Sequence, residues 1–363
     1  MTHTGKYRRI VIKIGSNVLT RDDGRPDTTR ISALVDQIAR LHRAGVEVVL
    51  VSSGAVASGR SLLESRVGRI DTVSARQLYS AVGQVKLLNR YYDLFNDYGI
   101  ACGQVLTTKE SLSTRRQYLN QRNCMEAMLA AGVIPIVNEN DTISVTELMF
   151  TDNDELSGLV AAMMDADALL ILSNIDCIYD GSPADPSSQV IRRVAPGRDL
   201  SQYIDTTRSS RGRGGMTSKS RISSRVAGEG IEVVIANGRR DEILTDLVLT
   251  ERDVVCTRFE AARHAASGVK KWIASSEGFA KGALRLDAGA AAAVSRSKAA
   301  SVLAVGVTDV EGDFERDDIV RILTPEGTQL GVGRISCDSA TARRNLGRKG
   351  LKPLIHCDYL YLE

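Results

Sequence analysis

Short apolar runs that end in small polar loops recur along the first half of the chain. The four pairs of run and loop are residues 10–14 with Gly15, 48–51 with Ser52 to Ala55, 134–137 with Asn138 to Asp141, and 169–172 with Ser173 and Asn174. Continuous apolar runs are typical of parallel strands that are covered on both faces. Ligands bind at the carboxyl ends of such strands in an open α/β sheet, so the pattern predicts that the four loops line one site.

Between these runs, apolar residues recur at helical spacing. Ile31, Leu34, Val35, Ile38 and Leu41 fall on one helical face and predict a helix from about Thr29 to Ala44. The same reasoning predicts helices at 75–98, 115–131, 154–164 and 217–228, and strands at 9–14, 46–51, 100–106, 133–137, 168–172 and 231–236. Alternating strands and helices predict an α/β fold, with a mostly parallel sheet sandwiched by helices.

The pattern changes after about residue 260. Short strand-like segments separated by Gly, Asp and Pro turns occur at 282–286, 303–307, 319–323 and 330–335. They predict a small, mainly β domain that follows a linker at 258–277. We therefore expect two domains, residues 1–260 and residues 275–363.

Composition narrows the function classes. The 363 residues are 43% hydrophobic and 25% charged, as is ordinary for a globular protein. No apolar run approaches the roughly 18–20 residues of a membrane span, and the N-terminus leads straight into a strand, so we expect a cytoplasmic protein without membrane contact. The six cysteines and four histidines are scattered, which disfavours a metal or histidine-based centre. We assign no metal-ligating residue and expect Lys, Asp and backbone amides to carry the chemistry.

The net charge of +3 lies entirely in the last third of the chain. Residues 261–363 contain 15 Lys and Arg against 12 Asp and Glu, whereas the two classes balance in residues 1–260. A solvated surface accounts for this excess more simply than a nucleic-acid contact does. An RNA role therefore remains an alternative, as an addition to another activity.

Two of the loops have the character of anion sites. Lys13 is a single charge in an apolar strand, beside Gly15, where the backbone can approach a ligand closely. The amides and hydroxyls of Ser53, Gly54 and Ala55 precede a helix and suit a phosphate or a carboxylate. The alternatives are a surface lysine and a simple helix cap.

Two acidic clusters lie ten residues apart, Asn138 to Asp141 and Thr151 to Asp154. Asp141 and Asn153 could hold an ammonium or amide group, and an aspartate placed between two lysines could hold both. The paired acids could instead bind Mg²⁺ or cap helices.

A glycine-rich loop precedes the predicted helix at 217–228. It contains Arg213, Gly214, Gly215, Met216, Thr217, Ser218 and Lys219. Such a loop can cradle phosphate, although its spacing is not that of a P-loop. Two lysines and anion-binding loops suit phosphoryl transfer, which depends on positioning and charge stabilisation. Because a carboxylate acceptor is already ionised, it needs no general base, and the chain offers no obvious one.

Together, the motifs around Lys13, Ser53, Asp141, Asp154 and Lys219 resemble the amino-acid kinase family nearly end to end, and within it the branch of glutamate 5-kinases. The C-terminal β domain resembles a PUA domain, which that branch commonly carries. The resemblance implies ATP- and Mg²⁺-dependent phosphorylation of the γ-carboxylate of L-glutamate, the first step of proline biosynthesis. A kinase of another small carboxylate is the alternative.

The resemblance also implies residue roles. Lys13 and Lys219 would stabilise the transferring phosphoryl group, and Asp154 would orient them. Ser53, Gly54, Ala55, Asp141 and Asn153 match glutamate-binding positions, while Lys13, Gly15, Ser173, Asn174 and 213–219 match the nucleotide site. It further implies a homo-oligomer inhibited by proline. Ser173-Asn174, Cys177 and Arg213 depart from the family pattern.

Overall fold

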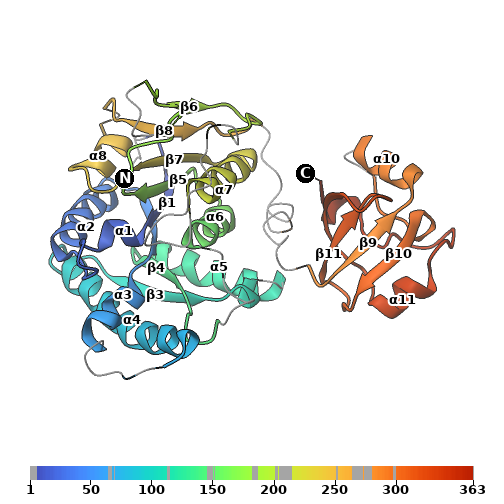
Figure 1. The fold of residues 1–363 in the computed structure, drawn as a ribbon, viewed down its shortest axis with the longest axis horizontal. Helices are drawn as coiled ribbons and strands as arrows, with labels where there is room; N and C mark the ends of the chain where they lie inside the picture. Colours follow the sequence, from blue (N-terminus) through green and yellow to red (C-terminus); the bar gives the residue numbers. More distant parts are fainter. Residues whose placement is uncertain are drawn as a thin grey trace. The chain divides into compact units, whose positions relative to one another are not determined.

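The computed structural model describes residues 6–63, 68, 70–112, 115–144, 150, 152–181, 187–200, 203, 215–250, 252–263, 273, 280–296 and 300–362. The chain forms two compact units (Figure 1). The first consists of Met1–Thr108 and Gln121–Ala265, and the second of Lys109–Asn120 and Ala266–Glu363.

The first unit is built on an eight-stranded sheet with the order β3-β4-β2-β1-β5-β7-β8-β6. The strands are β1 (Arg9–Ile14), β2 (Glu47–Ser52), β3 (Cys102–Thr107), β4 (Ile134–Glu139), β5 (Ala168–Ser173), β6 (Arg193–Val194), β7 (Glu232–Asn237) and β8 (Cys256–Phe259). The pairs from β3 to β7 are parallel, and β8 runs antiparallel to β7. The predicted mostly parallel sheet is therefore confirmed.

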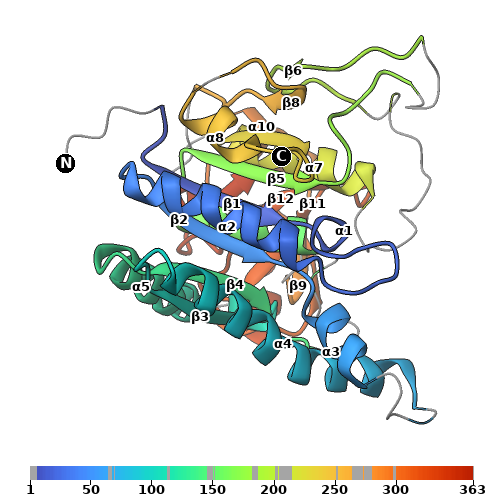
Figure 2. The ribbon, with the colours of Figure 1, turned by 90° about the vertical axis from the view of Figure 1, so that its left-hand side faces the viewer.

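Helices cover both faces of this sheet, as Figures 1 and 2 show, with α2 and α8 on one face and α6 and α7 on the other. The helices are α1 (Ser16–Leu19), α2 (Thr28–Arg43), α3 (Ala55–Leu63), α4 (Thr72–Asn96), α5 (Arg115–Ala130), α6 (Asn153–Met163), α7 (Met216–Gly228) and α8 (Ile243–Val248). The five apolar residues that predicted α2 are all buried. Asp27 caps this helix by accepting a hydrogen bond from the Arg30 N–H, and Gly45 follows its end with a φ of 84°.

The four strands whose loops the sequence singled out are consecutive neighbours, in the order β4-β2-β1-β5. They are parallel, so their carboxyl ends and the loops that follow lie along one edge of the sheet. The loops therefore share one edge of the sheet, as the prediction that they line one site requires.

The second unit has a five-stranded sheet in the order β10-β9-β11-β12-β13. Its elements are β9 (Gly282–Leu286), α10 (Ala288–Arg296), β10 (Val307–Gly312), β11 (Ile319–Leu323), β12 (Gln329–Arg334), α11 (Ser339–Arg344) and β13 (Leu360–Leu362). Leu284, Val320, Ile322 and Ile355 belong to a core of its own. The predicted small, mainly β domain is confirmed.

Two local predictions are wrong. Residues 303–307 do not form a strand: Ala304–Gly306 is a 3-10 turn in which the Gly306 N–H bonds to the Leu303 carbonyl, and the strand begins only at Val307. Leu303 and Val305 are exposed, so the apolar alternation there does not face the core. The expected linker begins too early, because Phe259 is buried in β8 against β7. No described helix is both long and apolar enough to cross a membrane.

Candidate active site

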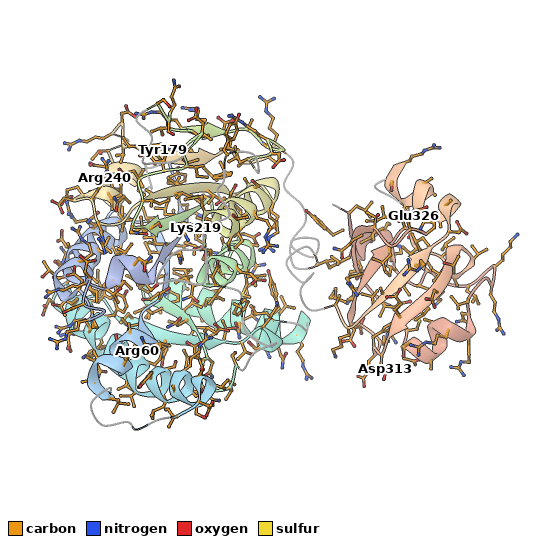
Figure 3. The ribbon with its side chains drawn as sticks, in the orientation of Figure 1. Arg60, Tyr179, Lys219, Arg240, Asp313 and Glu326 are labelled. Carbon is orange, nitrogen blue, oxygen red and sulfur yellow. The ribbon has the colours of Figure 1, made fainter. Side chains whose placement is uncertain are left out.

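Two lysines and one aspartate form a buried centre, here called the ammonium centre. Lys13 lies on β1, Asp154 in the first turn of α6, and Lys219 in the first turn of α7. The Lys13 Nζ lies 2.5 Å from Asp154 Oδ1, and the Lys219 Nζ lies 2.9 Å from Asp154 Oδ2. Lys219 is labelled in Figure 3. The predicted aspartate between two lysines is thus present in the geometry.

Burial and charge act in opposite directions on Asp154. Its side chain is fully buried, which by itself would raise the pKa of the carboxyl group. The charges and hydrogen bonds of Lys13 and Lys219 outweigh burial and hold that pKa below its usual range. The carboxylate therefore stays ionised at neutral pH and fixes both ammonium groups in place.

Gly15 lies where the ends of β1 and β5 come together. Its N–H donates a 3.0 Å hydrogen bond to the Leu172 carbonyl. A Cβ at this position would lie 3.2 Å from that carbonyl oxygen and 3.4 Å from the Lys13 Nζ. A side chain here would crowd the lysine, so glycine leaves space beside the ammonium group.

Asp152 links the starts of α6 and α7, a role that the sequence did not reveal. Its Oδ1 accepts hydrogen bonds from the N–H groups of Asp154 at 2.8 Å and Glu155 at 3.0 Å, which caps α6. Its Oδ2 accepts a 2.5 Å hydrogen bond from the Ser218 hydroxyl. Burial and the nearby Asp154 raise the pKa of Asp152. These bonds position Asp154 and Lys219 relative to each other.

Asn153 joins the loop after β2 to the end of β4. Its Nδ2 donates hydrogen bonds to the Ser53 hydroxyl at 2.9 Å, the Ser52 carbonyl at 3.1 Å and Asn138 Oδ1 at 3.3 Å. Gly54 follows with a φ of 98°, a conformation that favours glycine, and Ala55 begins α3. The structure therefore brings the predicted residues Ser53, Gly54, Ala55 and Asn153 together.

Asp141 belongs to a second charged group, here called the arginine cluster, which consists of Arg76, Glu139 and Asp141. Arg76 comes from α4 and forms an ion pair with Asp141, while its Nη2 lies 3.4 Å from Glu139 Oε2. The Ser80 hydroxyl donates a 3.4 Å hydrogen bond to Asp141 Oδ2. Burial raises the pKa of Asp141, opposed by Arg76, and raises the pKa of Glu139 to about 7.

No role for Arg76 or Glu139 was predicted from the sequence. Glu139 belonged to the polar cluster Asn138 to Asp141, which was predicted to be a loop. The structure instead places it as the last residue of β4, where it is buried. For Arg76, the available signal was a polar stripe on α4, since Arg76 and Ser80 are four residues apart and share a face of the helix. Gln77 Nε2 supports this contact by donating a 2.8 Å hydrogen bond to the Thr142 carbonyl.

The other predicted nucleotide residues lie at the end of β5 and at the start of α7. The Ser173 hydroxyl is 3.5 Å from Asn174 Oδ1, and the Ser173 carbonyl accepts a 2.8 Å hydrogen bond from the Gly238 N–H. Gly215 caps α7, followed by Met216, Thr217 and Ser218 in its first turn. Arg213 and Gly214 lie outside the described residues.

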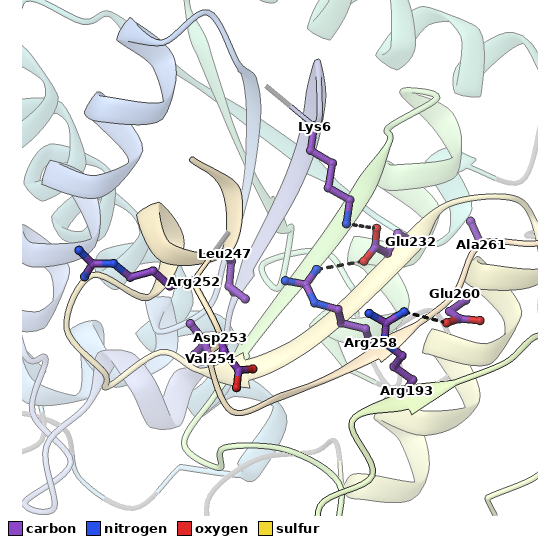
Figure 4. Close-up of a pocket in the computed structure, with 10 residues that line it drawn as sticks. All are labelled: Lys6, Arg193, Glu232, Leu247, Arg252, Asp253, Val254, Arg258, Glu260 and Ala261. Carbon is purple, nitrogen blue, oxygen red and sulfur yellow. Dashed lines mark hydrogen bonds and ion pairs between the residues drawn. The ribbon is translucent and has the colours of Figure 1, made fainter. Parts of the chain in front are cut away.

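A hollow of about 440 Å³ (Figure 4) contains none of the predicted site residues. Lys6 precedes β1 and Glu232 begins β7, so the hollow lies at the amino ends of these strands, opposite the ammonium centre. Glu232 accepts ion pairs from Lys6 at 2.9 Å and Arg258 at 3.0 Å, and Arg193 lies 3.5 Å from Glu260. The lining carries four cations, Lys6, Arg193, Arg252 and Arg258, against three carboxylates, Glu232, Asp253 and Glu260, so its charges nearly balance.

Comparisons with known proteins agree with this architecture. A model of the amino acid kinase family matches residues 8–237, and a model of the PUA domain matches residues 282–354. A glutamate 5-kinase of Bacteroides thetaiotaomicron is 63% identical over 358 residues, covering 99% of each chain, and one of Chlorobaculum tepidum is 46% identical, covering 98% of each.

Solved structures with a similar fold include two kinases of low sequence identity. A carbamate kinase from Giardia lamblia bound to AMP-PNP matches with a TM-score of 0.53 at 16% identity, covering 71% of this chain and 99% of its own. A UMP kinase from Bacillus anthracis matches with a TM-score of 0.50 at 16% identity, covering 70% and 96%. At this identity the likeness concerns the fold alone.

Proposed function

The chain belongs to the amino acid kinase family, and from this premise we propose that it transfers the γ-phosphoryl group of ATP to the γ-carboxylate of L-glutamate. The product, L-glutamyl 5-phosphate, would enter proline biosynthesis. The full-length similarity to glutamate 5-kinases supports this substrate. The observation that carries the proposal is the ammonium centre, with Lys13 and Lys219 held on either oxygen of Asp154.

The ammonium centre suits phosphoryl transfer because negative charge accumulates on the transferring group and its neighbours in the transition state. Lys13 and Lys219 are catalytic in this proposal and stabilise that charge, while Asp154 orients them. Ionised Asp154 keeps both lysines paired in the absence of ligand, so their ammonium groups need little rearrangement. The acceptor carboxylate is already ionised, and no residue is required to remove a proton.

Glutamate would lie beside the loops after β2 and β4. Ser53, Gly54, Ala55, Asp141 and Asn153 are its proposed binding residues. Asp141 offers a carboxylate to the substrate ammonium group, and the Asn153 amide ties the two loops together. The nucleotide would contact Gly15, Ser173, Asn174, Gly215, Met216, Thr217 and Ser218, with Arg213 and Gly214 proposed on the sequence motif alone.

We propose that Mg²⁺ enters with ATP and is held mainly by phosphate oxygens. Asp152 is engaged by the α6 N–H groups and Ser218, and Asp154 is engaged by two lysines. Both carboxylates are therefore engaged by groups of the protein itself. Mg²⁺, when bound with ATP, would supply positive charge that offsets the charge of the phosphates.

The central test is ADP release by the purified protein with glutamate, aspartate or N-acetylglutamate, together with trapping of the acyl phosphate as a hydroxamate. We expect release that depends on glutamate. Lys219→Ala should lower kcat by about 10³-fold, as expected for the loss of one charge stabiliser. Preferential use of aspartate or N-acetylglutamate would show that the substrate is another small carboxylate and not glutamate. A fully active Lys219→Ala variant would contradict the mechanism.

Further proposals concern the whole protein. We propose domain boundaries of 1–260 and 275–363, a cytoplasmic location and feedback inhibition by proline. A homo-oligomer is supported by Leu78, Val85 and Tyr92, which are exposed at seven-residue spacing on one face of α4. Light scattering of Val85→Glu should detect a smaller particle. RNA binding through 275–363 remains a secondary candidate, which salt-dependent binding at low ionic strength would test.

A further inference from the structure

The arginine cluster has the charges that a zwitterionic head group requires. An α-amino acid carries an ammonium group and a carboxylate on one carbon, and the cluster sets Arg76 against Asp141 at the substrate edge of the sheet. Both side chains are largely buried, with exposed fractions of 18% for Arg76 and 9% for Asp141. A ligand that binds there must satisfy two charges of opposite sign close together.

We propose that Arg76 binds the α-carboxylate of the substrate while Asp141 binds its α-ammonium group, so that the pair acts as a clamp for the amino-acid head. The inference rests on the proposed function and extends it by a residue that determines specificity. In the structure described here the two clamp residues satisfy each other. A bound head group would then insert into an existing ion pair, and each charge would find a new partner.

Charge balance favours a zwitterion over the alternatives. Separating a buried ion pair without replacement leaves an uncompensated charge, which is strongly unfavourable. A ligand with the carboxylate alone satisfies Arg76 but leaves Asp141 beside a second negative group. A ligand with the ammonium group alone takes Asp141 from Arg76 and leaves Glu139, whose Oε2 lies 3.4 Å from Arg76 Nη2, as a more distant carboxyl partner. A head group with both charges gives Asp141 and Arg76 each a new close partner.

The surroundings hold the clamp in place. Gln77 on the same helix bonds to the Thr142 carbonyl at 2.8 Å, and Ser80 bonds to Asp141. Asp71 caps α4 by accepting hydrogen bonds from the N–H groups of Val73 and Ser74. Arginine is suited to this place because its planar guanidinium can bind a carboxylate through two parallel hydrogen bonds.

Glu139 provides a reason why Arg76 can change partners. Its Oε2 lies 3.4 Å from Arg76 Nη2, beyond a short ion pair, while its Oε1 accepts a 2.9 Å hydrogen bond from the Phe150 N–H. Arg76 thus faces two carboxyl groups, and Asp141 is the closer one. When Asp141 turns to an ammonium group, Glu139 and the substrate carboxylate remain to balance the guanidinium.

The test is a matrix of three proteins and three substrates, read as kcat/KM from ADP release. The substrates are L-glutamate, its α-amide, which lacks the α-carboxylate charge, and glutarate, which lacks the ammonium group; all three retain a γ-carboxylate. The proteins are the unsubstituted chain, Arg76→Gln and Asp141→Asn. Arg90→Gln, at an exposed position on the same helix, is the matched control.

We expect the unsubstituted protein to prefer glutamate over either analogue by about 100-fold or more, since sites built around buried charges reject partners that lack them. Arg76→Gln should reduce the preference over the α-amide to about tenfold or less and keep the preference over glutarate. Asp141→Asn should do the reverse. Both should raise the KM for glutamate with a much smaller change in kcat and in the KM for ATP, and Arg76→Lys should recover part of the lost preference.

The outcomes separate the clamp from the function. No glutamate-dependent ADP release by the unsubstituted protein would overturn the proposed function and the clamp with it. Release with uniform losses on all three substrates in Arg76→Gln, and thermal unfolding like that of Arg90→Gln, would overturn the clamp alone and leave the function standing. A crossed pattern of losses would support it, because a merely structural arginine cannot distinguish the α-amide from glutarate.

Discussion

The ammonium centre has more cations than carboxyl groups, and the arginine cluster has more carboxyl groups than cations. The first places two cations on one carboxylate, and the second places one cation against two carboxyl groups. Both are buried at the carboxyl edge of the same sheet. The first suits a group that gains negative charge during reaction, and the second suits the zwitterionic head of an amino acid.

Their proton affinities differ as well. The two lysines hold the pKa of Asp154 down in spite of burial, whereas burial raises the pKa of Glu139 to about 7 with only partial opposition from Arg76. The ammonium centre therefore keeps its charges across the neutral range, and the arginine cluster changes its charge within it. One fold edge thus combines a fixed electrostatic site with one that responds to pH.

The largest expected effect comes from breaking the ammonium centre with Asp154→Asn. An amide cannot balance two buried ammonium groups, so we expect the free energy of unfolding to fall by about 3–5 kcal/mol. The lysines would also lose their fixed positions, and kcat should fall by about 10³-fold. Urea unfolding and steady-state ADP release measure the two effects separately.

The control is Asp241→Asn, because Asp241 is 92% exposed and lies 3.4 Å from Arg30. An exposed pair of this kind contributes about 1 kcal/mol or less, so both stability and kcat should be nearly unchanged. If Asp154→Asn retained kcat within about tenfold, positioning of the lysines by this carboxylate would not be needed for transfer, and the orienting role proposed for Asp154 would be wrong.

A smaller effect is expected from Glu139→Gln, which tests whether the arginine cluster titrates. The pKa of Glu139 is raised to about 7 in the folded protein, so its protonated form is favoured there. Its contribution to stability is complete below the pKa of the unfolded chain and is lost as the pH rises through about 7. The stability difference between the unsubstituted protein and Glu139→Gln should therefore fall by about 2 kcal/mol between about pH 5 and pH 8.

Glu232→Gln provides a control of opposite sign. Burial opposes ionisation of Glu232, but hydrogen bonds and charges from Lys6 and Arg258 lower its pKa. Its contribution is present above its unfolded pKa and is lost only as the pH falls through the lower folded value. The stability difference between the unsubstituted protein and Glu232→Gln should therefore be constant across the neutral pH range and should decline at acidic pH. If the stability difference varied with pH in the same way for Glu139→Gln and Glu232→Gln, the proposed difference in their pKa shifts would be wrong.

Much of the ammonium centre could be predicted from the sequence. Lys13 and Asp154 stand in motifs at the end of a strand and the start of a helix, where local pattern fixes their position. The hydrophobic runs predict parallel strands, and loops that follow parallel strands lie at one edge of a sheet. The order β4-β2-β1-β5 then makes these four loops neighbours.

The arginine cluster could not be predicted in the same way. Arg76 lies 65 residues from Asp141 and belongs to a helix whose polar positions resemble an ordinary solvated face. Only the packing of α3 against α4 turns that face inward: a Cβ on Gly83 would lie 1.8 Å from the Ala55 carbonyl oxygen, so the two helix backbones approach closely. The polar stripe of Arg76 and Ser80 is a local signal, but the sequence does not show which groups that stripe contacts.

Short elements were missed for a different reason. β8 has four residues, and only its contacts make it a strand, since Thr257 bonds to backbone groups on either side while Phe259 fills the core. The wrong strand at 303–307 shows the converse, because apolar alternation predicts a strand even where two of the side chains face solvent. Burial decides both cases, and it is a property of the fold.

The smallest expected effect distinguishes the two sites through their hydroxyl groups. Ser80 donates to Asp141 at 3.4 Å, and Ser218 donates to Asp152 at 2.5 Å beside the ammonium centre. Ser80→Ala removes a long hydrogen bond and should raise the KM for glutamate only about two- to fivefold, equivalent to about 0.5–1 kcal/mol. Ser218→Ala removes a shorter bond to a carboxylate and should act more strongly, on kcat and the KM for ATP. If instead Ser80→Ala altered the KM for ATP and Ser218→Ala altered that for glutamate, the assignment of one site to phosphate and the other to the amino-acid head would be reversed.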